Sequence, residues 1–338
     1  MNRDSPDPTA TIEYSDPAQL VSAPVISVVM LVYNHRYNLG EAIESVIMQD
    51  HGFPIELLIG EDCSTDGSNE LVHDYRRRYP QTIRVVTAEC NVGAYRNCMR
   101  LFSMARGEFI AQLDGDDYWL PGKLSEQVAL LRARNEAVAV YANALALNQD
   151  GVLVGQFNDV GYAEFDLAAI LRRGNFLNTS TMMFRSSLIS ALQGIGHEFI
   201  DFQTHLTIAR HGNVLHVARP LAAYRTRSAG SMLGNDNARV RELYWQAIQS
   251  VPRELVSDND YAHGLADFLR RVFFRAVRTR SRALWREWEP RVFAAAPYGA
   301  SRMYLLTAAN ILRMAAKETI GLFRRDARGH RFRVLYRR

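Results

Sequence analysis

Apolar runs and amphipathic stretches alternate along the first half of the chain. The run ISVVMLVYN at residues 26–34 is rich in β-branched residues, and the stretch at 41–48 that follows it has apolar positions at helical spacing. The run is apolar on both faces, which is typical of a strand buried in a parallel sheet. The same alternation predicts strands at 55–60, 83–87 and 109–113 and helices at 69–78, 95–105 and 123–134. It indicates an α/β fold, a mostly parallel sheet with helices on both faces.

The pattern becomes less regular beyond residue 135. We expect further strands at 137–144, 178–184, 214–217 and 221–224, and a helix at 202–210. After about Asn235 no strand pattern recurs, and helical spacing of apolar and arginine residues predicts helices that include 265–277 and 303–320. Residues 1–24 are acidic, contain several prolines and lack an apolar run, so we expect a disordered lead-in and neither a signal peptide nor an anchor.

Charge divides the chain into an acidic body and a basic tail. Residues 261–338 carry 18 Lys and Arg against 5 Asp and Glu, whereas residues 1–260 carry 22 against 31. No apolar run reaches the length of about 18 residues that a membrane-spanning helix needs. The three cysteines show no paired spacing, which favours a reducing compartment. Together these features predict a cytoplasmic protein that does not span a membrane.

The strongest local signal is the acidic loop DGDDYW at residues 114–119, directly after an expected buried strand. Asp114, Asp116 and Asp117 place three carboxylates within four positions, and a bound cation would offset their mutual repulsion. Ligands that are all oxygen atoms favour Mg²⁺ or Mn²⁺ over Zn²⁺. The alternative interpretation is an acidic surface turn that caps the helix after Pro121.

Two other loops carry residues suited to a nucleotide. Ligands bind parallel sheets at the carboxyl ends of the strands, and this rule singles out residues 33–38, 61–67 and 114–119. Asp62, after the second strand, can accept hydrogen bonds from a ring N–H or a ribose hydroxyl. Arg96 follows a glycine turn at the start of a helix, where it can contact a diphosphate.

In this order and spacing, the segments resemble the family 2 glycosyltransferases with the GT-A fold. The resemblance extends from about residue 25 to residue 231 and rests on ISVVMLVYN, IGEDCSTDGS, NVGAYRN, GEFIAQLDGDDYWLPGKLSEQ and the stretch from IDF to YRTRSAGS. It implies a Rossmann-like GT-A fold and an inverting enzyme that moves a sugar from a nucleotide-sugar onto an acceptor hydroxyl. It also implies a GT-A domain at 25–235, with a nucleotide-binding half at 25–125 and an acceptor half at 126–235, followed by a basic helical C-terminal region at 236–338.

The resemblance assigns roles to individual residues. Tyr33 and Asp62 would hold the nucleobase, and Arg96 would lie by the base or the diphosphate. Asp114 would touch the ribose or the metal, and Asp116 would be the main metal ligand. The implied cofactor is Mn²⁺ or Mg²⁺, and the implied donor is a nucleotide-sugar such as a UDP-sugar.

The general base of the family is an acidic residue that opens a later helix, often within Glu-Asp or Gly-Asp. In this sequence Ile200 and Asp201 occupy that place, so the carboxylate is kept while the first half of the pair is absent. Asp201 is therefore the expected base, with Glu198 as the fallback. A helix-capping role for Asp201 is the alternative.

The remaining candidate residues would contact the diphosphate or the acceptor. Arg225 and Arg227, in YRTRS, would clamp the diphosphate as a closing loop shuts, or else they are surface arginines. Trp119 and residues 178–181, including Thr181, would face the acceptor.

Other protein classes fit the sequence less well. A nucleotidyltransferase or a dinucleotide oxidoreductase would need a glycine-rich phosphate loop after the first strand, and no glycine occurs between that strand and Gly40. A nucleotide-sugar or glycan-binding module that has lost catalysis is the remaining alternative, because the residue before Asp201 departs from the family pattern.

The basic tail allows two interpretations. Its arginines and aromatic residues at helical spacing suit contact with an anionic membrane surface, which would serve a lipid-linked acceptor. The tail would equally suit a helical subdomain that packs on the core. The resemblance implies a glycan or lipid-linked acceptor in bacterial surface polysaccharide or lipopolysaccharide synthesis, at the inner face of the cytoplasmic membrane, and no nucleic-acid partner.

Overall fold

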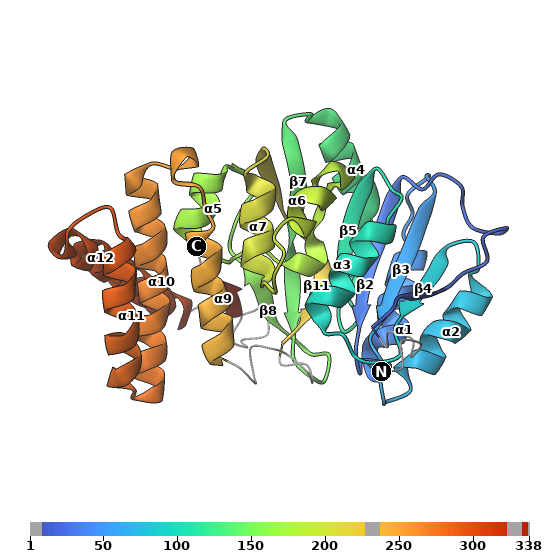
Figure 1. Ribbon diagram of the computed structural model, residues 1–338, viewed down its shortest axis with the longest axis horizontal. Helices are drawn as coiled ribbons and strands as arrows, with labels where there is room; N and C mark the ends of the chain where they lie inside the picture. The colour runs from blue at the N-terminus through green and yellow to red at the C-terminus, as the bar shows by residue number, and fades with distance from the viewer. Residues whose placement is uncertain (1–8, 227–236, 323–332, 337–338) are drawn as a thin grey trace, which may run out of the picture.

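The computed structural model describes residues 9–226, 237–322 and 333–336. A sheet runs through the body of the molecule with helices on both of its faces, and a group of C-terminal helices lies at one end (Figure 1). The predicted α/β architecture with a helical C-terminal region is confirmed.

The first half of the chain follows the predicted alternation of strands and helices. Its elements are β1 (Ile12–Tyr14), β2 (Ile26–Val32), α1 (Arg36–Ile47), β3 (Ile55–Glu61), α2 (Ser68–Arg78), β4 (Ile83–Thr87), α3 (Ala94–Met104), β5 (Phe109–Asp114), β6 (Tyr118–Trp119) and α4 (Lys123–Ala133). Strands β2, β3, β4 and β5 are mutually parallel, in the spatial order β4-β3-β2-β5. Their carboxyl ends therefore share one edge, where the loops after β2 and β5 meet.

Two apolar cores form, one on each face of the sheet. Side chains of α1, α2 and α4, such as Leu39, Val72 and Val128, belong to one core. Leu101 and Phe102 of α3 belong to the other, together with residues of the helices later in the chain. Because the central strands are covered on both faces, most of their side chains are apolar, and this explains the apolar runs in the sequence.

The second half contains more elements than the sequence pattern indicates. They are β7 (Ala137–Leu147), β8 (Leu153–Asn158), β9 (Ala163–Phe165), α5 (Leu167–Arg173), η1 (Thr179–Thr181), β10 (Met183–Arg185), η2 (Ser186–Leu188), α6 (Ile189–Gln193), α7 (Asp201–Ala209) and β11 (Asn213–Arg225). The expected strand at 178–184 is wrong, since residues 179–181 form a 3₁₀ turn and only β10 pairs, antiparallel to β5 and β7. The expected pieces at 214–217 and 221–224 are one strand, β11, whose register shifts on either side of Pro220, a residue without a backbone N–H.

Part of the N-terminal segment is ordered, contrary to the prediction of a disordered lead-in. Strand β1 pairs antiparallel with β4 at the edge of the sheet. Its Glu13 accepts a hydrogen bond from Nε of Arg84 at 2.8 Å, and Arg84 also pairs with the fully buried Glu56. A buried charge pair requires such partners, so Glu13 fixes the first strand to the sheet.

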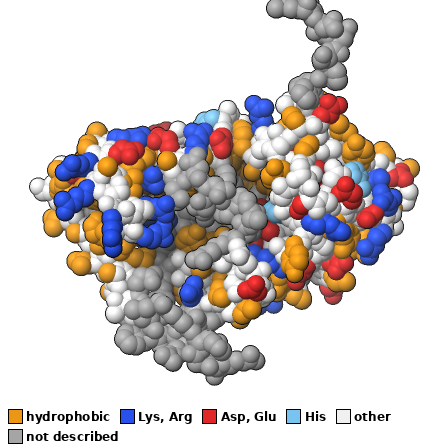
Figure 2. Space-filling view, turned by 90° about the horizontal axis from the view of Figure 1, so that it is seen from below, with side chains coloured by type: hydrophobic (Ala, Val, Ile, Leu, Met, Phe, Trp, Pro, Cys, Tyr) orange, Lys and Arg blue, Asp and Glu red, His pale blue; other side chains and the backbone are white. Residues whose placement is uncertain are grey.

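The basic C-terminal region forms a helical group that packs on the body. Its elements are α9 (Asn237–Gln249), η3 (Arg253–Leu255), α10 (Asp258–Thr279), α11 (Arg282–Ala295), α12 (Ala300–Leu322) and β12 (Arg333–Tyr336). Trp288 is 1% exposed and packs against Trp245 and Phe268, while α10 lies against α5. Figure 2 shows Lys and Arg side chains gathered over this end of the molecule. None of the described helices is both long enough and apolar enough to cross a membrane.

The chain returns to the sheet near its C-terminus, although the sequence shows no strand pattern there. Strand β12 pairs parallel with β8. Gly155 of β8 permits this pairing, because a Cβ there would lie 1.9 Å from the carbonyl oxygen of Arg333. Four residues are too few for a periodic signal, so β12 could not be expected from the sequence.

Lys123, at the start of α4, is fully buried. Its Nζ donates to Oε1 of Gln127 at 2.7 Å and lies 4.1 Å from the ring centre of Trp119. Burial lowers the pKa of Lys123 well below its ordinary value. Between that lowered pKa and the ordinary value of about 10.4, the unfolded chain binds more protons at this site than the folded protein does.

This imbalance predicts a pH-dependent stability. The unfolding free energy of the protein should rise with pH toward about 10.4, and a Lys123→Met variant should lack that part of the rise. Urea unfolding at several values of pH between 7 and 10 measures the difference. Lys317→Met is the control, since Lys317 of α12 is the second of the two lysines in the sequence. Parallel pH profiles for the Lys123→Met variant and the unmodified protein would contradict the prediction.

Candidate active site

The acidic loop joins the end of β5 to β6. Gly115 lies so close to the end of β2 that a Cβ there would be 2.7 Å from Nδ1 of His35 and 2.9 Å from the carbonyl oxygen of Leu31. Asp117 is 1% exposed and accepts hydrogen bonds from the Ser180 hydroxyl at 2.6 Å and from the backbone N–H of Arg225 at 2.9 Å. Asp117 therefore holds the loop to η1 and β11, as a structural residue.

The other two carboxylates of the loop open into different cavities. Asp114 lines a cavity of about 360 Å³, the central cavity, between the sheet and helices α9 and α10. Asp116 lines a cavity of about 520 Å³, the α1 cavity, which also contains residues 34–38 and Arg225. Reduced hydration, together with the charges of Asp116 and Asp201, raises the pKa of Asp114 to about 8. A bound cation would relieve the repulsion between these neighbouring carboxylates.

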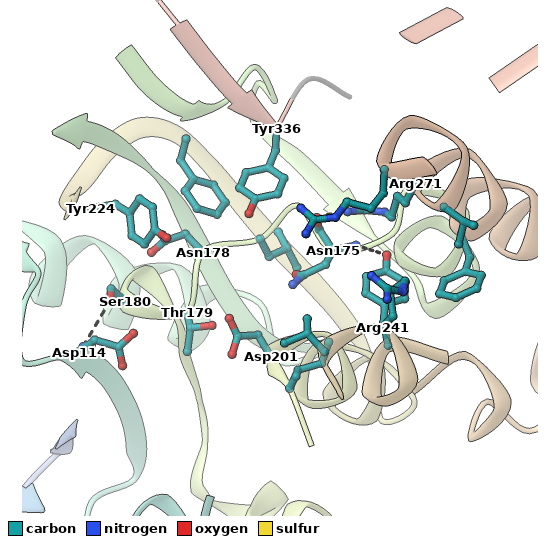
Figure 3. Close-up of a pocket in the computed structure, with 18 of the residues that line it drawn as sticks. Asp114, Asn175, Asn178, Thr179, Ser180, Asp201, Tyr224, Arg241, Arg271 and Tyr336 are labelled. Carbon is teal, nitrogen blue, oxygen red and sulfur yellow. Dashed lines mark hydrogen bonds between the residues drawn. The ribbon is translucent and has the colours of Figure 1, made fainter. Parts of the chain in front are cut away.

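Asp201 is the first residue of α7 and stands between two cavities. It lines the central cavity and also a cavity of about 280 Å³, the α3 cavity, on the side of α3. Figure 3 shows its carboxylate beside the hydroxyl of Thr179, on the same side of the central cavity as Asp114. Surrounding protein reduces its hydration and raises its pKa, whereas the Thr179 hydroxyl lowers it. A carboxylate with a raised pKa that remains accessible is suited to accept a proton.

Glu198, the fallback base, is occupied by another interaction. Its carboxylate accepts a hydrogen bond from Arg239 at 2.8 Å, although it also lines the α3 cavity. An ion pair at the surface holds this carboxylate away from the cavity that Asp114 lines.

The candidate nucleotide contacts lie around the carboxyl ends of β2 and β3. Tyr33, directly after β2, is 44% exposed, and Arg96 lies exposed in the first turn of α3 and lines the α3 cavity. Asp62 is 2% exposed, and its carboxylate accepts hydrogen bonds from the backbone N–H groups of Val92 (2.8 Å) and Gly93 (2.9 Å). Asp62 thus orders the loop that begins α3, and this is a contact that the sequence did not predict.

Two candidate acceptor contacts lie in the interior. Trp119 is 3% exposed, and its indole N–H donates to the carbonyl oxygen of Ser180 at 2.7 Å. Thr181 is fully buried, and its hydroxyl bonds the backbone of Ala142 and Asn178. Both side chains are part of the interior that holds η1 in place, and neither lines the central cavity.

Arg225 is placed close to the acidic loop but is already engaged. It is 8% exposed and bonds the Glu41 carboxylate and the carbonyl oxygen of Asp116. It lines the α1 cavity, so a contact with a diphosphate there would need the Glu41 pair to open. Arg227 lies outside the described residues.

The central cavity includes side chains that the sequence did not assign to a site. Phe157, Tyr224 and Tyr336 form an aromatic wall, with ring centres 5.3 Å apart for Phe157 and Tyr224 and 4.6 Å apart for Phe157 and Tyr336. Arginines of α9 and α10 line the opposite end. The spacing of Arg271, Arg275 and Arg278 places them on one helix face and could have been read from the sequence. The contribution of Tyr336 could not be predicted from the sequence, because it depends on the pairing of β12 with β8.

The fold and the site define a class of protein. A mixed sheet with the parallel strands β4-β3-β2-β5, an acidic loop beyond β5 and a carboxylate at the start of a later helix are the features of a sugar-transferring enzyme of the GT-A fold. The chain belongs to Glycosyl transferase family 2, whose family model matches residues 27–228, more than half of the sequence.

Individual proteins agree with this family. An uncharacterized protein of Mycobacterium tuberculosis is 30% identical over 207 residues, 61% of this chain and 60% of that protein. The Escherichia coli enzyme WfaP, named as a UDP-Glc:alpha-D-GlcNAc-diphosphoundecaprenol beta-1,3-glucosyltransferase, is 25% identical over 66% of this chain and 84% of its own. The crystal structure of S. aureus TarS 1-349 with UDP-GlcNAc superposes with a TM-score of 0.62 at 19% identity and covers 89% of this chain and 93% of that one. The chain spans about three-fifths of the length of the mycobacterial relative.

Proposed function

We propose that the protein transfers a sugar from a nucleotide-sugar onto a hydroxyl of a glycan or lipid-linked acceptor, with inversion at the anomeric carbon. The observation that supports this most strongly is the position of Asp201, whose carboxylate lines both the central cavity and the α3 cavity. A residue at such a boundary can contact an acceptor on one side while a donor occupies the other.

The donor nucleotide is assigned to the side of α3. Exposed Arg96 and the loop ordered by Asp62 line the α3 cavity, and the N-terminus of α3 provides backbone N–H groups suited to an anion. Exposed Tyr33 follows Leu31, another residue of this lining, by two positions. TarS was crystallised with UDP-GlcNAc, and WfaP is named for the use of UDP-Glc. We therefore propose a UDP-sugar as the donor.

The reaction is a single displacement. The acceptor hydroxyl attacks the anomeric carbon from the face opposite the leaving group, and the bond from this carbon to the diphosphate oxygen breaks. The departing nucleoside diphosphate keeps the electron pair of that bond. Asp201 takes the proton of the attacking hydroxyl, and because no enzyme nucleophile takes part, the configuration inverts.

The acidic loop fits a divalent cation. Asp114 and Asp116 offer only oxygen ligands, which suit Mg²⁺ or Mn²⁺. Burial raises the pKa of Asp114 most, and the charges of Asp116 and Asp201, whose repulsion a cation would offset, raise it further. The described part of the chain has no group of three or more His, Cys, Asp or Glu that could hold a metal, so donor phosphate oxygens would complete the coordination. When bound, the cation would neutralise negative charge on the departing diphosphate.

The acceptor and its location follow from the relatives and the charge of the C-terminal helices. WfaP is named for an acceptor on diphosphoundecaprenol, and we propose a lipid-linked acceptor in the synthesis of a bacterial surface polysaccharide. Such an acceptor would place the protein at the inner face of the cytoplasmic membrane. Exposed Leu305 and Leu312 of α12, beside Arg302 and Arg313, suit peripheral contact with anionic lipid there.

A panel of nucleotide-sugars tests the proposal. The protein is incubated with Mn²⁺, each donor and a mixture of lipid-linked sugars, and the release of nucleoside diphosphate is measured. We expect release with at least one UDP-sugar, and a product whose anomeric configuration, read by NMR, is opposite to that of the donor. A product of retained configuration, or no release with any donor, would contradict the proposed function.

A further inference from the structure

The central cavity is polarised along its length. Asp114 and Asp201 lie at one end, and Arg241 and Arg271 lie at the other, as Figure 3 shows. Arg275 and Arg278 also line the cavity from α10, at positions one turn and two turns after Arg271. Asp114 and Asp201 are the only acidic residues among the described lining of this cavity, so its α10 end carries a net positive charge.

The arginines of α10 differ in how the fold uses them. Arg271 is held in position because its Nε donates to Asp267 at 2.9 Å and its guanidinium bonds the carbonyl oxygen of Asn175 at 3.2 Å. Within residues 9–226, 237–322 and 333–336, the guanidinium groups of Arg275 and Arg278 have no hydrogen-bond or ion-pair partner. Three positive charges on one helix face repel one another, so an anion between them would be stabilising.

The middle of the cavity suits a sugar ring. Phe157, Tyr224 and Tyr336 provide flat apolar faces, and Asn178 lies at the edge of this wall (Figure 3). Asn178 is 2% exposed, and its buried Oδ1 accepts no hydrogen bond from the described residues. A buried acceptor without a partner is costly, and a sugar hydroxyl or N–H in the cavity would satisfy it.

We propose that the central cavity binds an acceptor sugar that carries a phosphate or diphosphate on its anomeric carbon. The phosphate lies against Arg271, Arg275 and Arg278, the ring lies along the aromatic wall, and the attacking hydroxyl lies at Asp201. The phosphate is unchanged by the reaction and serves only for recognition. This inference rests on the proposed function, since it identifies the acceptor of the same site.

The charge pattern favours this acceptor over two others. A neutral glycan would leave the arginine end without a partner. The diphosphate of the donor is assigned to the other side of Asp201, where Arg96 lines the α3 cavity, so a second anionic group is needed to account for the arginines of α10.

The double variant Arg275→Gln/Arg278→Gln tests the inference. Each sugar of a panel is offered in three forms: linked to a short alkyl diphosphate, as the sugar 1-phosphate, and as a neutral alkyl glycoside. We expect the unmodified protein to prefer both phosphorylated forms to the neutral glycoside of the same sugar. In the double variant, kcat/KM for the phosphorylated forms should fall about 10- to 100-fold, as expected for lost hydrogen bonds to charged groups. Its preference for the phosphorylated forms over the neutral glycoside of the same sugar should shrink accordingly.

Several outcomes would overturn the inference. One is equal use of neutral and phosphorylated acceptors by the unmodified protein, and another is a double variant that keeps the preference. Weaker UDP binding by the double variant, measured by calorimetry, would place the arginines in the donor site instead. If the protein hydrolyses a UDP-sugar but glycosylates no phosphorylated acceptor, the acceptor inference fails while the donor half of the proposed function stands.

The matched control is Arg313→Gln. Arg313 lies exposed on α12 and lines none of the three cavities. The Arg313→Gln variant removes one arginine of the same basic region and should leave the acceptor preference unchanged. Equal loss in this control would show that general positive charge, and not the cavity, causes the preference. Thermal unfolding of each variant checks that the fold is kept.

Discussion

An Asp201→Asn variant is expected to lose about 10²- to 10⁴-fold in kcat for sugar transfer, the contribution typical of a positioned general base. Asparagine has nearly the same shape, but its side chain cannot accept the proton of the attacking hydroxyl. Asp201 is the first residue of α7, and because asparagine is also well tolerated at the start of a helix, the fold should be kept. Affinity for UDP, measured by calorimetry, should change little, because the change concerns the acceptor proton.

Glu198→Gln is the matched control for this prediction. Glu198 lines the same α3 cavity and is also acidic, but its carboxylate pairs with Arg239. We expect this variant to keep its transfer rate within a few-fold of the unmodified protein. If Glu198→Gln loses more activity than Asp201→Asn, then Asp201 is not the base.

The nucleotide side of the site could be predicted from the sequence because it is built from local segments. Each of its loops follows directly after a buried strand, and the parallel order of the strands brings their ends together. Asp114 and Asp116 could be assigned to one edge of the sheet in this way. The partners that make Asp117 a structural residue, Ser180 and Arg225, come from segments distant in the sequence.

The acceptor side could not be predicted in the same way because distant segments meet there. Its walls come from the sheet, from α10 and from β12, which follow one another over more than 150 residues. Trp119 illustrates the limit of local reasoning. It follows the acidic loop directly, yet strand β6 directs the indole into the core, where it bonds Ser180.

The C-terminal helices connect fold and function. The sequence left open whether they contact a membrane or pack on the core, and α10 packs on α5 while one face of it lines the central cavity. The positive charge of this region is therefore partly directed inward. In our proposal this charge recognises the acceptor, and the exposed arginines of α11 and α12 remain available for an anionic surface.

The second large effect is expected for Asp116→Asn. Asp116 is 9% exposed, lines the α1 cavity and is the proposed main ligand of the divalent cation. Loss of the cation should reduce stabilisation of charge in the transition state by several kcal/mol, which corresponds to a fall of about 10²- to 10³-fold in kcat. Calorimetry of UDP binding with and without Mn²⁺ detects the loss of the cation at equilibrium. Mn²⁺ should strengthen UDP binding to the unmodified protein and have little effect on binding to the variant.

The Asp117→Asn variant separates the structural role of Asp117 from the proposed metal-binding role of Asp116. Because Asp117 joins the acidic loop to Ser180 and Arg225 in the interior, its replacement places an amide N–H₂ against one of two hydrogen-bond donors. We expect a lower unfolding temperature for Asp117→Asn and an unchanged one for Asp116→Asn. Conversely, Mn²⁺ should still strengthen UDP binding to the folded Asp117→Asn protein. If Mn²⁺ leaves UDP affinity unchanged in the unmodified protein, the acidic loop does not hold a cation, and the repulsion between Asp114 and Asp116 must be offset by another group.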